Sequence, residues 1–376
     1  MKRNLLLASL LLFCSFTFTL AQNGTNLFAG IEVGSKGVKI SVVALNANLD
    51  GDFSYSVKAD SSVNTEIIEF KEFSITESAK AAVIFYNKAI NDFKIPNRQI
   101  FLVISSGVVK QAQLTNNTDK IDQLKTLILT QLNQPKKTVD FLTPEVEARL
   151  VYLGTIHKKN RDGAVIIDIG SGNTKGGHFD KTGAFTPFDF NWGTAKLKTE
   201  INKKQPNSIT EYNGFVKDAI VKIKDNDIST TFNQRIVIRN QPFMIMGGGI
   251  NWVIVTLMRP DKMDKAFMEL SLNDIREFKK NIQNNYEAFV DDARAVTPDA
   301  LIEFGKVKRN FDQKSMIAGV ALLEAIMEEL NSTSPTKTYY FARYSSWLTG
   351  YIVKSKMGET EIDNLEHNEI EGKPKN

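Results

Sequence analysis

The sequence predicts an α/β protein of two domains with a cleft between them. Its 376 residues exceed the ~100–200 residues of one ordinary domain. Apolar runs of strand length alternate with segments of helical spacing. A Gly-rich strand–turn–strand unit occurs twice, at Ile31 and at Ile167, about one domain length apart. A short-period repeat would recur within a few tens of residues, so this spacing indicates two related domains.

The N-terminus has the pattern of an export signal. Lys2 and Arg3 precede an apolar stretch from Leu5 to Leu20, and Ala21 follows at the place of cleavage. The alternative is an uncleaved anchor, but the apolar run falls short of the ~20 residues of a spanning helix. We therefore expect an exported protein, periplasmic or secreted, with residues 1–21 removed and no stable membrane insertion afterwards.

Charge and cysteine content exclude some classes of function. The formal net charge of +4 includes Lys2 and Arg3, so signal removal leaves +2. A nearly neutral protein is not expected to bind nucleic acid through bulk charge. The single cysteine, Cys14, lies in the predicted signal. The mature chain then has neither a disulfide nor thiolate chemistry.

The first predicted domain covers residues 26–158. A β-hairpin opens it, with strands at 27–33 and 38–45 around a Gly-Ser-rich tip. Pro144 at a first helical position marks the start of its last helix. The other expected elements are strands at 54–57, 67–70 and 99–104 and helices at 76–93, with Thr76 as N-cap, 119–132 and 144–156. The 99–104 strand is expected to run into a polar loop at Ser105-Ser106-Gly107.

The second predicted domain covers residues 160–354. Its strongest strand is 163–169, which is rich in Val and Ile and has a hairpin partner at 175–179. A last helix at 345–354 can pack back toward the hinge. Residues 359–376 are polar and are expected to be a disordered tail. The remaining elements are strands at 243–246 and 338–341 and helices at 250–258, 272–282 and 314–330.

The duplicated unit carries the chemistry. Each copy has an apolar strand, an acidic residue (Glu32 or Asp168), a Gly-rich turn and a returning strand. Backbone amides of such turns bind phosphate oxygens, and the carboxylate can hold a divalent metal or the attacking water. Two ordinary hairpin turns are the alternative, which the duplication disfavours. The candidate phosphate-binding residues are Gly34, Ser35, Lys36, Gly170, Ser171, Gly172, Asn173 and Thr174, with Gly248 and Gly249 of a third glycine loop before a helix.

Other catalytic patterns are missing from the sequence. The histidines His157, His178 and His367 have no metal-ligand spacing, and no G-x-S-x-G or Walker pattern occurs. Glu147, near the start of the 144–156 helix, would by itself be interpreted as part of a solvated helix face.

The ordered motifs resemble the exopolyphosphatase/guanosine pentaphosphate phosphohydrolase family, which belongs to the actin, sugar kinase and heat-shock ATPase superfamily. The resemblance extends over about residues 27 to 355 and implies two ribonuclease-H-like (actin-like ATPase) domains. It rests on five segments, namely the hairpins at 31–35 and 167–175, the interdomain helix at 143–154, Trp192-Gly193-Thr194-Ala195-Lys196-Leu197, and the glycine loop at 247–249.

The resemblance also implies an activity and a site. The family removes a terminal phosphate from polyphosphate or guanosine pentaphosphate with a divalent metal. Glu147 falls on its general base, Asp168 and Glu32 would hold Mg²⁺ or Mn²⁺, and Lys110 would bind phosphate oxygens together with the turn amides.

Several positions depart from the family pattern. Glu32 replaces an Asp, Lys36 an Asn, and Lys110 an Arg whose bidentate fork is thereby lost. Lys175 replaces a Glu expected near the metal, where a cation would repel Mg²⁺. Near the C-terminus, residues 346–350 lack the two charges of the corresponding family segment.

Three functions remain open at this point. One is an exported phosphohydrolase that releases terminal phosphate from polyphosphate, with water activated by Glu147. The second is a catalytically impaired protein that binds phosphate polymers. The third is a nucleotide-binding relative, for which the sequence has no adenosine-pocket signal. The sequence does not decide between a monomer and a homodimer.

Overall fold

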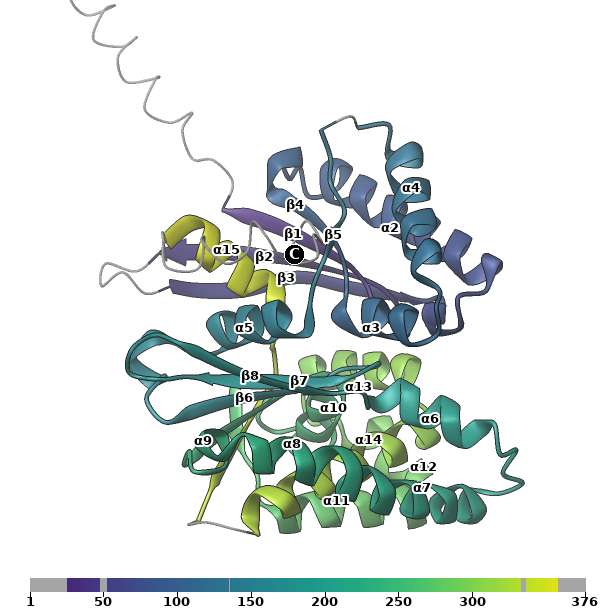
Figure 1. Ribbon diagram of the computed structural model, residues 1–376, viewed down its shortest axis with the longest axis vertical. Helices are drawn as coiled ribbons and strands as arrows, with labels where there is room; N and C mark the ends of the chain where they lie inside the picture. The colour runs from purple at the N-terminus through teal and green to yellow at the C-terminus, as the bar shows by residue number, and fades with distance from the viewer. Residues whose placement is uncertain (1–25, 48–52, 135, 333–335, 358–376) are drawn as a thin grey trace, which may run out of the picture.

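The computed structural model describes residues 26–47, 53–134, 136–332 and 336–357. Two α/β halves are stacked on one another, with one sheet in each half (Figure 1). The predicted signal peptide and the polar tail lie outside the described residues. Within the described part of the chain, no helix is long and apolar enough to cross a membrane.

The N-terminal half is built on a five-stranded mixed sheet in the order β3-β2-β1-β4-β5. The first three strands form an antiparallel meander, and β4 and β5 extend the sheet in parallel from β1. The strands are β1 (Leu27–Val33), β2 (Gly37–Ala47), β3 (Phe53–Asn64), β4 (Ile100–Ile104) and β5 (Asp140–Phe141).

The two faces of this sheet are covered by different helices. Because successive side chains of a strand point to opposite faces, Ala29, Ile31 and Val33 share a core with helices on one side. Phe28 belongs to a second core on the other side. The helices of the first core are α2 (Glu72–Asn91), α3 (Ser106–Leu114) and α4 (Thr118–Leu132).

The C-terminal half is built on a six-stranded sheet in the order β10-β11-β9-β6-β7-β8. Strand β6 is buried along its whole length, because its alternate residues enter the cores on the two faces. A fully buried parallel strand reads as an unbroken apolar run, which is the pattern at 164–169. The strands are β6 (Ala164–Ile169), β7 (Thr174–Phe179), β8 (Phe185–Phe190), β9 (Phe243–Gly247), β10 (Phe267–Glu269) and β11 (Thr338–Ala342).

Most helices of the C-terminal half cover the outer face of its sheet (Figure 1). The central one is α14 (Gln313–Asn331), which is buried along most of its length. The others are α6 (Thr194–Asn202), α7 (Ile209–Ile223), α8 (Ser229–Gln234), α9 (Ile236–Arg239), α10 (Gly249–Met258), α11 (Leu272–Asn284), α12 (Tyr286–Phe289) and α13 (Pro298–Asn310).

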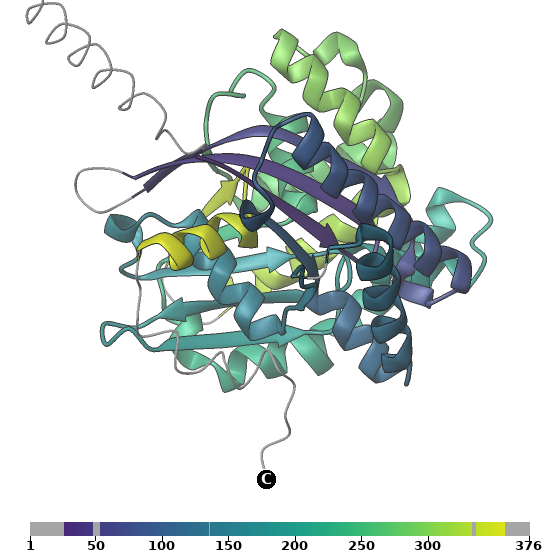
Figure 2. The ribbon, with the colours of Figure 1, turned by 90° about the horizontal axis from the view of Figure 1, so that it is seen from above.

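The halves are joined by two helices in contact, α5 (Pro144–Thr155) and α15 (Trp347–Met357). A Cβ atom at Gly350 would lie 1.8 Å from the Leu150 carbonyl oxygen, and one at Gly154 would lie 2.4 Å from the Gly350 nitrogen. The helix backbones therefore touch. Figures 1 and 2 place α15, the last helix of the described residues, beside the N-terminal sheet. It packs at the hinge, as the sequence allowed.

Some local predictions were wrong. The expected polar loop at 105–107 is the start of helix α3, and the expected strand at 67–70 is a 3₁₀ helix, Ile67–Glu69. Helix α2 begins at Glu72, one turn before the predicted N-cap Thr76. Helix α3 has only nine residues, and the stability of so short a helix comes from packing rather than from propensity.

Candidate phosphate site between the domains

The two predicted phosphate hairpins meet at the seam between the domains. Ser35 at the tip of the first hairpin is 2% exposed. A Cβ at Gly172 in the second hairpin would lie 2.4 Å from Ser35 Oγ. A Cβ at Gly107, near the start of α3, would lie 3.1 Å from Asn173 Oδ1 and 3.2 Å from Ser35 Oγ. The sequence therefore placed these turns together correctly, and in this structure their tips are in contact.

The backbone amides of the turns fall into two groups. Three predicted donors are already engaged: Gly34 N donates to Gly37 O, Gly170 N to Asn173 O, and Gly248 N to Ser345 Oγ. The second group makes no hydrogen bond within the described part of the chain and is available to an anion. Its members are Ser35, Lys36, Ser171 and Gly172.

Lys175 forms the centre of a buried ion-pair cluster. Its Nζ lies 2.8 Å from Glu147 Oε1 and 2.8 Å from Asp168 Oδ2. The lysine side chain is 3% exposed, and those of Glu147 and Asp168 are 6% and 11% exposed. The residue of strand β7 that departs from the family pattern thus lies between the predicted general base and the predicted metal ligand.

The carboxylate of Glu147 is held from two sides. Besides Lys175, the backbone N–H of Ser106 donates to Glu147 Oε2 at 2.9 Å. Ser106 is the first residue of helix α3, where free N–H groups and the helix dipole favour negative charge. Burial disfavours the charged form of Glu147, but Lys175 and Ser106 outweigh burial and lower the pKa of the carboxyl group.

The charge of Lys175 is equally stabilised. Burial alone would lower the pKa of this amine, yet the two carboxylates at 2.8 Å raise it above the ordinary value. One cation is therefore paired with two buried anions, which leaves the cluster a net charge of −1. Pairing and hydrogen bonding are what make buried charge tolerable.

The residues present do not fit the metal that the resemblance implies. A hard divalent cation needs several oxygen ligands with free lone pairs. The ammonium group of Lys175 lies between the two nearest carboxylates, and Glu32 instead accepts a hydrogen bond from Trp347 Nε1 at 3.1 Å. Across the described residues, no three His, Cys, Asp or Glu side chains gather as a metal site.

The remaining predicted residues surround the cluster in varied roles. Lys36 lies over the Phe311 ring at 4.6 Å, and burial together with Lys198 and Lys39 lowers the pKa of Lys36 to about 8. Lys110 pairs with Asp189 of β8 across the seam. The Asn173 side chain donates one N–H to Ser106 Oγ, and the Thr174 hydroxyl donates its single proton to the Trp192 carbonyl, so Thr174 cannot also donate to a phosphate.

The third glycine loop supports strand β6. Gly248 has φ 96°, a region that favours glycine, and a Cβ there would lie 2.2 Å from the Ile169 carbonyl oxygen. Gly247 is the parallel neighbour of Asp168, and Gly249 begins α10. The loop therefore holds the strand that carries Asp168.

Sequence reasoning missed three partners of the site: Ser106, Asp189 and Trp347. Ser106 follows a strand and precedes apolar residues at helical spacing, which is a helix-start signal. Asp189 and Trp347 had no signal, because only strand pairing and the return of α15 bring them to the site.

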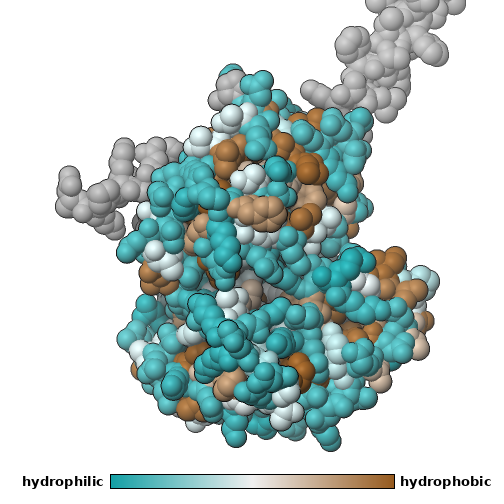
Figure 3. Space-filling model, turned by 90° about the vertical axis from the view of Figure 1, so that its right-hand side faces the viewer, coloured by the Kyte–Doolittle hydropathy of each residue, from teal (hydrophilic) through white to brown (hydrophobic). Residues whose placement is uncertain are grey.

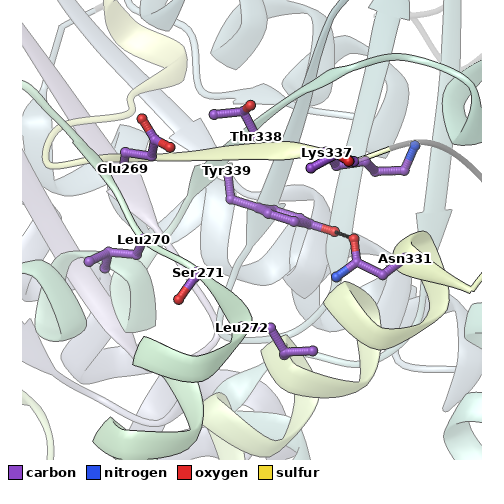
Figure 4. Close-up of a pocket in the computed structure, with 9 residues that line it drawn as sticks. Glu269, Leu270, Ser271, Leu272, Asn331, Lys337, Thr338 and Tyr339 are labelled. Atoms are coloured by element: carbon purple, nitrogen blue, oxygen red, sulfur yellow. Dashed lines mark hydrogen bonds between the residues drawn. The ribbon is translucent and has the colours of Figure 1, made fainter.

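A separate cavity lies away from the hairpins and the Lys175 cluster. It measures about 390 Å³ and is bounded by residues 269–272, Asn331 and 336–339. In Figure 4 the Tyr339 hydroxyl donates to Asn331 Oδ1 at 2.8 Å, and the Lys337 ammonium donates to backbone carbonyls of Arg239 and Gln241. None of the predicted site residues lines it.

Comparison with known proteins identifies structures with a similar fold. None of the family models matches the sequence, and no curated protein does. Solved structures do match. A Ppx/GppA family member from Aquifex aeolicus is 15% identical, with a TM-score of 0.59 over 89% of this chain and 98% of its own. An exopolyphosphatase-like protein is also 15% identical, with a TM-score of 0.62 over 88% and 97%.

A third match is an exopolyphosphatase from Cytophaga hutchinsonii, with 11% identity, a TM-score of 0.54 and coverage of 88% and 97%. These likenesses confirm the predicted fold class and the family resemblance in architecture. The protein has the two-domain, actin-like ATPase fold of the Ppx/GppA exopolyphosphatase structures.

Proposed function

We propose that this protein binds phosphate chains at the seam between its domains without hydrolysing them. The observation that carries the proposal is the ion-pair cluster in which Lys175 Nζ lies 2.8 Å from both Glu147 and Asp168. In this cluster the Lys175 ammonium group takes the place expected for the divalent metal, and it pairs with Glu147, the predicted general base.

The state of Glu147 argues against hydrolysis. A general base needs a free lone pair and a pKa near the working pH. Both oxygens of Glu147 accept hydrogen bonds, from Lys175 and from Ser106, and the pKa of the carboxyl is lowered. A water molecule beside it would find a carboxylate of lowered basicity whose two oxygens each already accept one hydrogen bond.

Binding itself is supported by the donors at the hairpin tips. The unengaged amides of Ser35, Lys36, Ser171 and Gly172 are the kind of group that binds phosphate oxygens, and the Lys36 ammonium adds charge. Because the tips touch, admission of a phosphate requires the two halves to separate about α5 and α15.

Polyphosphate is the ligand we propose. Two of the similar structures are described as an exopolyphosphatase and an exopolyphosphatase-like protein. The basic n-region and apolar run at residues 1–21 support export, and an exported protein would meet an external phosphate polymer rather than a cytoplasmic guanosine nucleotide.

Two measurements on residues 22–376 test the proposal. Titration calorimetry with long-chain polyphosphate in EDTA is expected to give saturable binding, and free phosphate is expected to stay at the blank level with Mg²⁺ or Mn²⁺. No binding in the presence or absence of metal would overturn the proposal.

The second candidate function is hydrolysis with Glu147 as base. It is favoured by the position of Glu147 in the first turn of the interdomain helix α5, in contact with Lys175 of the second hairpin and with the start of α3. Phosphate release that disappears in Glu147→Gln, with binding retained, would establish this function instead.

A further inference from the structure

A second cavity opens on the seam, between helix α3 of the N-terminal half and helix α6 of the C-terminal half. It measures about 160 Å³, below the ~300–1,000 Å³ of sites that enclose drug-sized ligands. The side of the molecule on which α3 and α6 lie is largely hydrophilic (Figure 3). Polar residues from both halves line the cavity: Gln111, Thr115 and Asn117 on one side and Lys196, Thr199 and Lys203 on the other.

Lys196 supplies a cation that forms no salt bridge within the described part of the chain, although the carboxylates of Glu200 and Asp227 are near enough to act on its pKa. Its Nζ lies over the Trp192 ring at 5.4 Å. Burial, opposed by Glu200 and reinforced by the nearby Lys110, lowers the pKa of Lys196 to about 8. The other charged side chains at the cavity are paired: Lys203 with Glu200 at 2.7 Å, and Glu69 with Lys71 at 2.5 Å. An anion would therefore find one positive charge that is not held in a salt bridge and is only partly offset by Glu200 and Asp227.

Gln111 supplies an unsatisfied polar group. Its Oε1 is buried and has no hydrogen-bond partner. A buried polar atom without a partner is destabilising, and such atoms are rare without a reason. Because amide oxygen and nitrogen are interchangeable by rotation of the group, the side chain can turn its NH₂ toward an anion in the cavity.

The cavity continues the hairpin site. Helix α3 starts at Ser106, which contacts Glu147, and Gln111 lies five residues further, about 7.5 Å along the axis. The first turn of helix α6 packs against the second hairpin. The backbone N–H groups of Ala195 and Lys196 both donate to the Ser171 carbonyl oxygen. Lys110, paired with Asp189, is near enough to Lys196 to lower the pKa of that lysine.

We propose that the α3–α6 cavity is a second anion subsite, in which Lys196 and Gln111 hold a further unit of an inorganic phosphate chain whose end lies between the hairpins. The subsite rests on the proposed function and adds to it, because it selects linear chains over single phosphates. The cavity is too small to hold a nucleoside. It therefore favours an inorganic phosphate chain over a nucleotide whose base would have to enter this cavity.

Titration calorimetry at low salt in EDTA tests the subsite on residues 22–376. The ligands are orthophosphate, tripolyphosphate, long-chain polyphosphate and ATP. For Lys196→Gln we expect roughly tenfold weaker binding of both chains, the size of a lost charge-assisted hydrogen bond, and unchanged binding of orthophosphate. Gln111→Glu keeps the side-chain shape, offers Lys196 a carboxylate, and is expected to reproduce this loss.

Lys217→Gln is the matched control, since it makes the same charge change on an exposed position of α7. Its chain affinity should equal that of the wild type, and all variants should keep the wild-type melting temperature. Chain affinity that is unchanged in Lys196→Gln, or that falls equally for orthophosphate, would overturn the subsite while leaving the proposed function intact. Tighter Lys196-dependent binding of ATP than of tripolyphosphate would overturn the inorganic-chain assignment. Wild-type protein that binds no phosphate ligand overturns both proposals.

Discussion

At the scale of single residues, Lys175 determines the chemistry of the site. It replaces a glutamate of the family pattern, and its ammonium group contacts both Glu147 and Asp168. The sequence raised the question of whether this lysine faces the cleft, and the strand pairing of β6 and β7 answers it. Lys175 is the register partner of Asp168, so the two side chains share a face of the sheet.

Replacement of Lys175 by glutamate should create a metal site. In Lys175→Glu, the ammonium group is removed and a carboxylate takes its place beside Glu147 and Asp168, which gives the oxygen set that a divalent cation needs. We expect Mn²⁺ binding by calorimetry or electron paramagnetic resonance in this variant and none in the wild type. Lys110→Glu, which makes the same charge change with Asp189 as neighbour, is the control. Equal Mn²⁺ binding by the wild type would show that Lys175 does not replace a metal.

Removal of the cation alone should destabilise the fold. Lys175→Met keeps most of the volume and leaves Glu147 and Asp168 buried without their partner. Breaking a buried pair in this way typically costs ~3–5 kcal/mol, measured as the free energy of unfolding in urea. Lys217→Met, at an exposed position, should change it by less than about 0.5 kcal/mol. A loss for Lys175→Met no larger than that of the control would contradict the cluster.

The pH dependence of stability follows from the same cluster. The pKa of Glu147 is lowered in the folded state, so its contribution is present above the unfolded value of ~4.3 and is lost as pH falls through the folded value. The pKa of Lys175 is raised, so its contribution is present below ~10.4 and is lost only as pH rises through the higher folded value. Wild-type stability should therefore fall on acidification below about pH 4. In Lys175→Met, acidification should instead recover stability, because protonation removes buried charge, and urea titrations at several pH values would measure the difference.

At the scale of elements, the two hinge helices depend on glycine. Helices α5 and α15 approach until the backbone of Gly350 meets that of Leu150. Helix α5 was predicted almost to the residue, because Pro144 and the Thr143 cap mark its start. Helix α3 was missed, since Ser105-Ser106-Gly107 favours a loop locally and the contact of Ser106 with Glu147 is made only by the fold.

A pair of glycine substitutions measures this contact. Gly350→Ala would place a Cβ 1.8 Å from the Leu150 carbonyl oxygen, so we expect a loss of at least ~1–3 kcal/mol, the range for overpacking. Gly214→Ala in α7 meets nothing within 4 Å and should stabilise the protein by up to ~1 kcal/mol through helix propensity. Melting temperatures that shift in the same direction for both variants would contradict the close helix crossing.

At the scale of the whole molecule, the seam is closed at the hairpin tips and a ligand must open it. Ser35 and Gly172 are the place for a cross-link between the tips, because a Cβ at Gly172 would lie 2.4 Å from Ser35 Oγ. This approach is closer than a disulfide allows, so the tips must shift slightly when the bond forms. The only natural cysteine, Cys14, lies in the predicted signal. In residues 22–376, the double variant Ser35→Cys/Gly172→Cys should bind polyphosphate when reduced and not when oxidised. Equal binding in both states would show that the ligand does not enter between the tips.

The sequence by itself determined the α/β fold, the two Gly-rich hairpins and the helix of Glu147. These features are local, since apolar periodicity, glycine turns and caps specify strands, hairpins and helices through neighbouring residues. Only the tertiary structure decided the state of the site. The contacts of Lys175 with Glu147, of Ser106 with Glu147 and of Trp347 with Glu32 join residues from distant parts of the chain. Whether a charge is paired, and whether a hairpin amide is free, depends on distances that arise when the two halves pack together.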